Sequence, residues 1–155
     1  MRTIRVYADT SVFGGVFDRE FRTASLAFFD QVKRRQISLF SSAIVREEIS
    51  FSPKAVRELF ASVLENAEII EITKSALDLR DAYLKAKIIP RKYANDALHV
   101  AAASVSGCPI IVSWNFKHIV HFDKIALYNS INILEGFPQI SIHSPLEVIS
   151  YEKRL

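Results

Sequence analysis

Three acidic residues of this sequence lie at an expected strand end or within an expected helix. Asp9 directly follows the apolar run Val6-Tyr7-Ala8, Glu48 lies in a short helical segment, and Asp96 lies in the first turn of an alanine-rich segment. Carboxylates that gather in one place cannot all stay ionised unless a cation lies among them. Their hard oxygen atoms suit Mg²⁺ or Mn²⁺, and such a site can activate water and stabilise charge on a phosphodiester. The sequence therefore predicts a hydrolytic metal site, provided that the fold brings these three acids together.

A fourth polar residue, Asn115, follows the apolar run Ile110-Ile111-Val112 and contributes a neutral carbonyl oxygen. In a site of this kind, two ions about 4 Å apart clamp both the attacking and the leaving oxygen of the phosphodiester. Whether the site holds one ion or two stays open at this point.

Strand-like and helix-like patterns alternate along the chain. Short β-rich or apolar runs predict strands at 3–8, 37–41, 68–72, 110–112 and 140–142. Apolar residues at helical spacing, with capping signals, predict helices at 24–35, 42–49, 53–64, 74–87, 95–106, 123–134 and 145–150. We therefore expect one domain over residues 1–155 with a three-layer α/β/α fold and a mostly parallel central sheet. Because ligands of such sheets bind beyond the carboxyl ends of the strands, Asp9, Ser42 and Ser113 are expected to share one crevice.

Composition limits the class of protein further. The chain has 155 residues, of which 50% are hydrophobic and 24% charged, which is ordinary for a globular domain. A net charge of +3 permits a nucleic-acid partner without requiring one. The sequence has no run of 18 apolar residues, so no membrane span is expected. Met1–Arg5 carries no signal-peptide pattern. The single Cys108 cannot form an internal disulfide and is expected to be a small apolar filler. These features favour a cytoplasmic protein.

Four segments together resemble the PIN-domain family, as found in VapC-type toxins of bacterial and archaeal toxin–antitoxin pairs. The segments are 6–12 (VYADTSV), 42–49 (SAIVREEI), 95–103 (NDALHVAAA) and 110–118 (IIVSWNFKH). Each is weak alone, but their order and spacing are fairly specific. The resemblance implies a metal-dependent endoribonuclease that uses Mg²⁺ or Mn²⁺, often forms a homodimer, and is inhibited by a small antitoxin protein.

Carried over by position, the family's acids fall on Asp9, Glu48 and Asp96, the expected metal ligands, and on Asn115, where aspartate is commoner. The hydroxyl that often precedes this last position falls on Ser113. We therefore expect Asn115 to orient water or a substrate phosphate as the fourth catalytic residue. Ser113, Lys117 and His118 are expected to contact substrate, and Arg46, Arg91 and Lys117 are candidates for contacts with the RNA backbone.

Several alternatives stay open. Asp9 suits a structural cap, because Asp-Thr-Ser favours a turn, and Glu47 is the ligand instead of Glu48 if the phase of its helix differs. His99 is on the same helix face as Asp96 but is more often a packed residue. Gly14 and Gly15 are expected to form a flexible loop.

Two further predictions concern Trp114 and the class of protein. Trp114 is expected to be a core anchor. The rival functions are a non-catalytic module that binds RNA or protein and a DNA-directed nuclease.

Overall fold

A five-stranded, fully parallel sheet lies at the centre of the computed structural model, which describes residues 3–153 and, from residue 150 on, only the backbone. Its strand order is β3-β2-β1-β4-β5. The strands are β1 (Ile4–Ala8), β2 (Ile37–Ser42), β3 (Ala67–Ile70), β4 (Ile110–Val112) and β5 (Ser141–His143). The prediction of an α/β/α fold around a mostly parallel sheet is confirmed.

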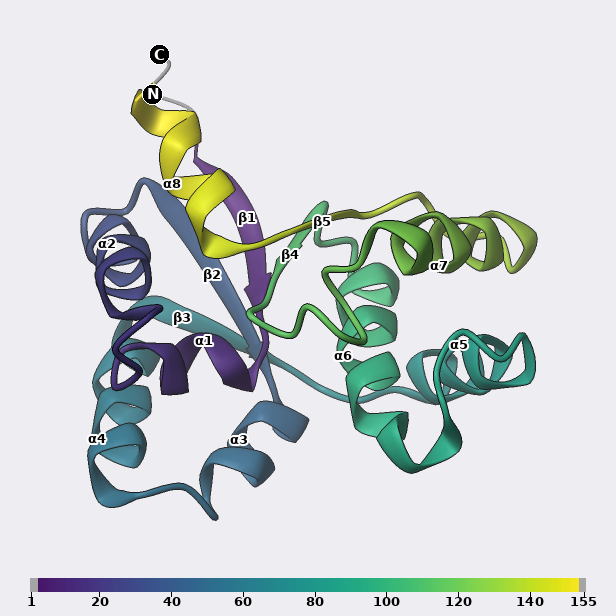
Figure 1. Ribbon diagram of the computed structural model, residues 1–155, viewed down its shortest axis with the longest axis horizontal. Coiled ribbons are helices and arrows are strands. Elements are labelled where there is room, and N and C mark those ends of the chain that lie inside the picture. The colour runs from purple at the N-terminus through teal and green to yellow at the C-terminus, as the bar shows by residue number, and fades with distance from the viewer. Residues whose placement is uncertain (1–2, 154–155) are drawn as a thin grey trace.

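Helices cover both faces of the sheet, as Figure 1 shows. On one side are α1 (Thr10–Gly15), α2 (Arg22–Lys33) and α4 (Lys54–Val63), with α8 (Pro145–Lys153) packed on α2. On the other side are α5 (Lys74–Lys85), α6 (Ala94–Val105) and α7 (Phe122–Leu134). The short α3 (Ala43–Ile49) contacts α1 and α4, and the 3-10 turns η1 (Leu64–Asn66) and η2 (Arg91–Tyr93) precede β3 and α6.

The central strand β1 positions the site. Val6, Tyr7 and Ala8 are fully buried, as expected for a parallel strand covered on both faces. β1 pairs with β2 and with β4, where Ala8 lies opposite Val112. The Asp9 amide continues this ladder by donating to the Val112 carbonyl at 3.2 Å. The residues that follow β1 and β4 therefore begin side by side at the carboxyl edge of the sheet.

Most predicted elements lie within a few residues of the observed ones, but the expected flexible loop at Gly14 and Gly15 is wrong. These glycines end α1, which Asp9 caps. Gly15 is buried, and a Cβ there would stand 2.6 Å from the Trp114 indole nitrogen. Close packing, rather than freedom of the backbone, is thus the reason for glycine here. A smaller correction concerns Pro53, which caps α4 instead of occupying its first turn.

Two expectations about composition can also be compared with the structure. Cys108 is buried and unbonded, as expected of a small apolar filler. Among the described residues, no helix has the length and apolar character needed to cross a membrane.

Candidate active site at the carboxyl edge of the sheet

Asp9 is both a helix cap and a buried acid. Its Oδ1 accepts hydrogen bonds from the backbone amide and hydroxyl of Ser11, at 3.1 and 2.6 Å, and its Oδ2 accepts from the Ser113 hydroxyl at 2.6 Å. The side chain is almost entirely inaccessible. Burial raises the pKa of Asp9, although His99 and the two serines oppose this shift. Asp9 is thus a buried acid whose two oxygens both accept hydrogen bonds.

Glu48 projects from α3 toward the same edge. The Ser42 hydroxyl caps this helix by accepting from the Val45 amide at 3.4 Å, which sets its phase. Glu48 is half-buried, whereas the neighbouring Glu47 is exposed. Glu48 Oε1 accepts from the Thr10 hydroxyl at 2.6 Å and lies 2.7 Å from His99 Nε2. Of the two adjacent glutamates, Glu48 is the one directed at the site. Burial opposes its ionisation, but the hydrogen bonds from His99 and Thr10 outweigh burial and lower the pKa of Glu48.

His99 links Glu48 to the centre of the sheet. The ring is buried, and its Nδ1 lies 2.8 Å from the Tyr7 hydroxyl, which lies 2.8 Å from the Ser42 hydroxyl. Burial raises the pKa of Tyr7, so its hydroxyl keeps its proton. In the neutral ring, Nε2–H then donates to Glu48. Sequence reasoning set His99 aside, although its position one turn after Asp96 was a usable signal.

Asp96 is held by a second histidine. His118 Nδ1 lies 2.8 Å from Asp96 Oδ2, and the imidazole packs on the Tyr93 ring with centroids 4.1 Å apart. Asn115 shapes the loop that carries this histidine, because its Oδ1 accepts from the amides of Lys117 and His118 at 3.2 and 2.9 Å. The His118 side chain is buried.

A family profile described as the PIN domain matches residues 6–126, most of the chain, including Asp9, Glu48, Asp96 and Asn115. The chain belongs to the PIN-domain family. No curated protein matches the sequence.

Two solved structures are similar in fold to this PIN domain. One is VapBC2 from Rickettsia felis bound to a DNA fragment from their promoter, with a TM-score of 0.58 and 15% identity. The other is FitAcB from Neisseria gonorrhoeae, with a TM-score of 0.59 and 12% identity. Each alignment covers 91% of this chain and 98% of the matched chain. At such identity the likeness shows the shared fold.

The acids of this PIN domain influence one another's protonation. Asp96 adds to the rise in the pKa of Asp9. Burial opposes protonation of His99, but hydrogen bonding to Glu48 and the charges of Asp9, Glu48 and Asp96 outweigh it and raise the pKa of His99. All three acids therefore act on one buried ring.

The donor chemistry fits a hard divalent cation, because all three acids present oxygen atoms. Asp96 Oδ1 accepts no hydrogen bond from a residue within 3–153. Among residues 3–153, no group of three or more His, Cys, Asp or Glu side chains is arranged to hold a metal ion. The three acids are instead hydrogen-bonded to His99, His118 and serine hydroxyls.

The residues expected to contact substrate occupy different environments. Ser113 is fully buried and donates to Asp9, while its oxygen accepts from the Asn115 amide at 2.9 Å. Lys117 is exposed, with Nζ 5.8 Å from the centroid of the Tyr93 ring. Trp114 is buried and donates to the Ser25 hydroxyl at 2.8 Å, as expected of a core anchor.

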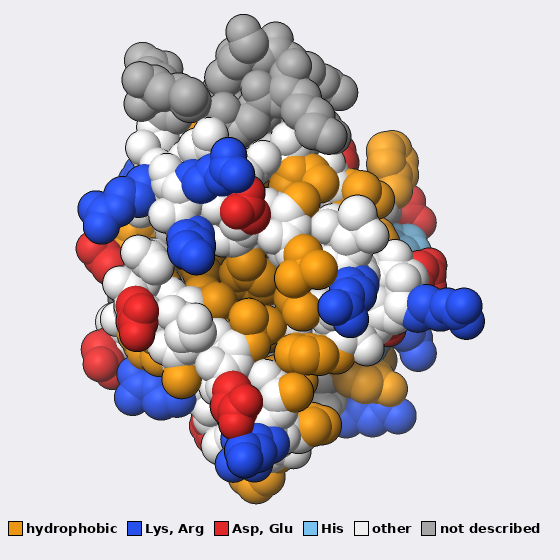
Figure 2. Space-filling model, turned by 90° about the vertical axis from the view of Figure 1, so that its left-hand side faces the viewer, with side chains coloured by type: hydrophobic (Ala, Val, Ile, Leu, Met, Phe, Trp, Pro, Cys, Tyr) orange, Lys and Arg blue, Asp and Glu red, His pale blue; other side chains and the backbone are white. Residues whose placement is uncertain are grey.

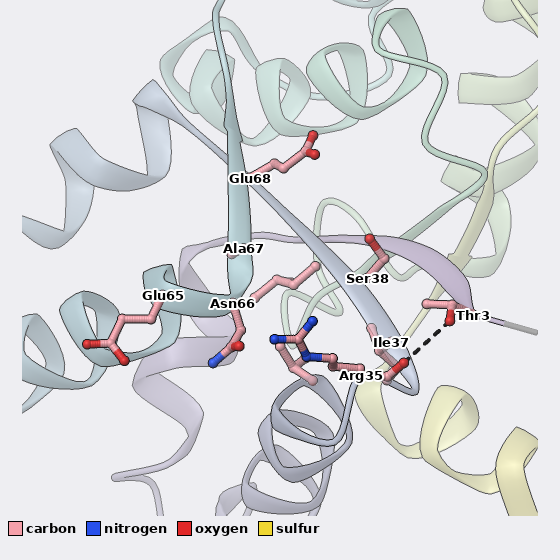
Figure 3. Close-up of a pocket in the computed structure, with 10 residues that line it drawn as sticks. Thr3, Arg35, Ile37, Ser38, Glu65, Asn66, Ala67 and Glu68 are labelled. Carbon is pink, nitrogen blue, oxygen red and sulfur yellow. Dashed lines mark hydrogen bonds between the residues drawn. The ribbon is translucent and has the colours of Figure 1, made fainter.

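A hollow of about 390 Å³ lies away from Asp9, Glu48 and Asp96, around the amino ends of β1, β2 and β3. Figure 3 shows the Arg35 side chain there, with Glu65 and Glu68 on nearby walls, and the Thr3 hydroxyl donating to the Arg35 carbonyl at 3.4 Å. Because ligands of parallel sheets bind at the carboxyl edge, this hollow is not the candidate active site.

Proposed function

We propose that this PIN domain is a metal-dependent endoribonuclease and the toxin of a type II toxin–antitoxin pair. The observation that carries the proposal is the placement of Asp9, Glu48 and Asp96. Each acid comes from a different element, each is oriented by a hydroxyl or an imidazole, and the three are electrostatically coupled. One buried and two partly buried carboxylates at the carboxyl edge of an α/β sheet indicate a site that requires a cation and handles phosphate.

The proposed ligands of Mg²⁺ or Mn²⁺ are Asp9, Glu48 and Asp96. When bound, the ion would supply Lewis acidity for water and positive charge for the phosphodiester. The chain's own contribution is orientation of the three acids, by Ser113 for Asp9, by His99 for Glu48 and by His118 for Asp96.

Asn115 is proposed to act in catalysis through the loop that it holds. Its Oδ1 is engaged by two backbone amides, and it adds no negative charge to the site. This favours one metal ion over two.

A small antitoxin and a second copy of the chain are the proposed protein partners. The motifs resemble VapC-type toxins, and the similar structures carry the names VapBC2 and FitAcB. An antitoxin arginine inserted among the carboxylates would neutralise them through charge-assisted hydrogen bonds. Co-expression with the small protein encoded by a neighbouring reading frame should yield a stable complex that does not cleave RNA.

Cleavage of three substrates tests the activity. Purified protein is incubated with single-stranded RNA, single-stranded DNA and branched DNA, each with Mn²⁺ and with EDTA. The proposal predicts internal cleavage of RNA with Mn²⁺ and none with EDTA. Preferential cleavage of either DNA would instead support a DNA-directed nuclease, and RNA cleavage of equal rate in EDTA would reject metal dependence.

The second candidate is a non-catalytic module that binds RNA or protein. It is favoured by Asn115 in place of a fourth acid and by the lack of a ready-made metal cage in the described part of the chain. Titration with Mn²⁺ discriminates the two functions. An ion that fails to bind at millimolar concentration favours the module.

A further inference from the structure

A basic pocket of about 600 Å³ opens between the end of α5, the turn before α6 and the start of α7. Its described lining includes the cations Lys85, Lys87, Arg91 and Lys124, and no carboxylate. Lys124 already has one hydrogen-bond partner within the chain, because its Nζ donates to the Ile88 carbonyl at 3.1 Å and so fixes the turn. Lys85, Lys87 and Arg91 are exposed. The pocket therefore offers several positive charges to a ligand.

Some cations of the described surface are paired with acids, and others are not. On α2, α4 and α5, the basic residues Arg34, Lys54 and Lys74 each pair with an acid one helical turn away. Figure 2 shows the α2 and α4 side, where both signs of charge surround a central apolar area. By contrast, Lys85, Lys87 and Arg91 form no salt bridge with any residue that the structure describes. Their charges are not neutralised within the described chain.

A short stretch of chain connects the pocket to the acidic site, and the Tyr93 ring lies on it. Arg91 begins η2, and Tyr93 ends it directly before α6, which carries Asp96. Lys92 and Lys117 place their ammonium groups 5.1 and 5.8 Å from the Tyr93 ring centroid. The same ring packs on His118, which contacts Asp96 at 2.8 Å. We call Lys85, Lys87, Arg91, Lys92, Tyr93 and Lys117 the basic strip.

We infer that the basic strip binds the backbone of single-stranded RNA and guides it to the acids, an inference that rests on the proposed ribonuclease function. Lysines that are spaced along a surface and form no salt bridge suit the binding of a nucleic-acid backbone of any sequence, because each lysine neutralises one phosphate. A partly exposed aromatic ring between cations is the platform on which single-stranded bases stack. The strip supplies the positive charge that an anionic strand needs beside an acidic site.

The test measures equilibrium binding of a fluorescein-labelled oligouridylate in EDTA, by fluorescence anisotropy at several salt concentrations. The Lys85→Glu/Lys87→Glu double variant and the Arg91→Glu variant should each lower affinity at least tenfold. They should also flatten the dependence of log affinity on log salt, by about 0.7 for each phosphate that the variant no longer neutralises. Tyr93→Leu should weaken binding and leave the salt dependence nearly unchanged, since stacking contributes little charge.

The matched control is the Lys33→Glu/Arg57→Glu double variant, which makes the same charge change at exposed positions of α2 and α4. It should bind RNA within about twofold of the wild type. Equally weakened binding in the control and strip variants would overturn the inference, because net charge alone would then explain binding. Binding of polyglutamate as tight as that of RNA would also overturn it. Circular dichroism and thermal unfolding of each variant establish that it is folded.

The outcomes separate this inference from the proposed function. RNA that binds through the strip but stays intact with Mn²⁺ would refute the ribonuclease and support the strip. RNA that is cleaved with Mn²⁺ but bound equally well by strip variants would refute the strip and support the ribonuclease.

Discussion

His99 Nε2 lies 2.7 Å from Glu48 Oε1, so a histidine of α6 holds an acid of α3 at the carboxyl edge of the sheet. The other ring nitrogen is fixed by Tyr7 on the central strand. A buried ring with both nitrogens engaged has one preferred orientation. The position of Glu48 is therefore determined by β1 and α6 as well as by its own helix.

Replacement of His99 should weaken metal binding. His99→Leu removes the donor to Glu48, and partners of this kind typically contribute 10–100-fold to metal affinity. We expect Mn²⁺ affinity, measured by calorimetry, to fall about tenfold. His99→Gln retains an N–H donor, so its Mn²⁺ affinity should fall less. Tyr7→Phe keeps the contact between His99 and Glu48, so its Mn²⁺ affinity should fall least. Unchanged affinity in His99→Leu would show that Glu48 does not need this support.

The same pair predicts how stability depends on pH in the metal-free protein. Because the pKa of Glu48 is lowered from 4.5, its contribution is present above pH 4.5 and is lost as pH falls through the lowered value. Because the pKa of His99 is raised from 6.5, its contribution is present below pH 6.5 and is lost as pH rises through the raised value. The excess unfolding free energy of wild type over His99→Leu should therefore be largest between pH 4.5 and 6.5. Urea denaturation in EDTA measures it, and an excess that grows steadily above about pH 7 would contradict the assignment.

The adjacent glycines of α1 should respond oppositely to alanine. Gly14 has open space around its missing Cβ, so Gly14→Ala should stabilise the protein by up to about 1 kcal/mol. A Cβ on Gly15 would stand 2.5 Å from the Ser25 hydroxyl and 2.6 Å from the Trp114 indole nitrogen, so Gly15→Ala should destabilise by about 1–3 kcal/mol. Denaturant unfolding compares the two variants, and similar effects would argue against close packing of α1 on Trp114.

Asn115 should tolerate aspartate better than alanine. Asn115→Asp retains an acceptor for the amides of Lys117 and His118, whereas Asn115→Ala removes both hydrogen bonds and should cost about 1–2 kcal/mol. The added charge of Asn115→Asp should also increase Mn²⁺ affinity, as calorimetry would show. Reduced affinity in Asn115→Asp would mean that its side chain serves the loop alone.

The strands and most helices could be predicted because their signals are local. The run Val6-Tyr7-Ala8 is typical of a buried strand, and the strand predicted there is confirmed. The helix predicted at 42–49 is observed as α3, with Ser42 as its cap. The helix α1 could not be predicted, because two glycines disfavour a helix and the Trp114 packing that requires Gly15 comes from a residue about 100 positions away. Tertiary contact here outweighs propensity.

The three acids of the candidate site could be proposed from the sequence, whereas the side chains that hydrogen-bond them could not. Asp9 follows β1, Asp96 lies in the first turn of α6 and Glu48 lies near the end of α3, and the resemblance to PIN-family motifs singles out all three. The roles of Tyr7 and His99 depend on the distance between β1 and α6, which no local pattern gives. The contact of His118 with Asp96 likewise depends on Asn115, which holds the loop that carries His118.

The central claim is that Asp9 and Asp96 serve one catalytic site, and a double-mutant cycle tests it most directly. The measurement is the rate of Mn²⁺-dependent cleavage of single-stranded RNA by wild type, Asp9→Asn, Asp96→Asn and the double variant. Each single substitution should lower the rate by about 10³-fold or more, and the double variant should be little slower, since residues that act as a unit are not additive. A single variant that cleaves at the wild-type rate, or a double variant whose rate reduction is the product of the two single reductions, would contradict the claim.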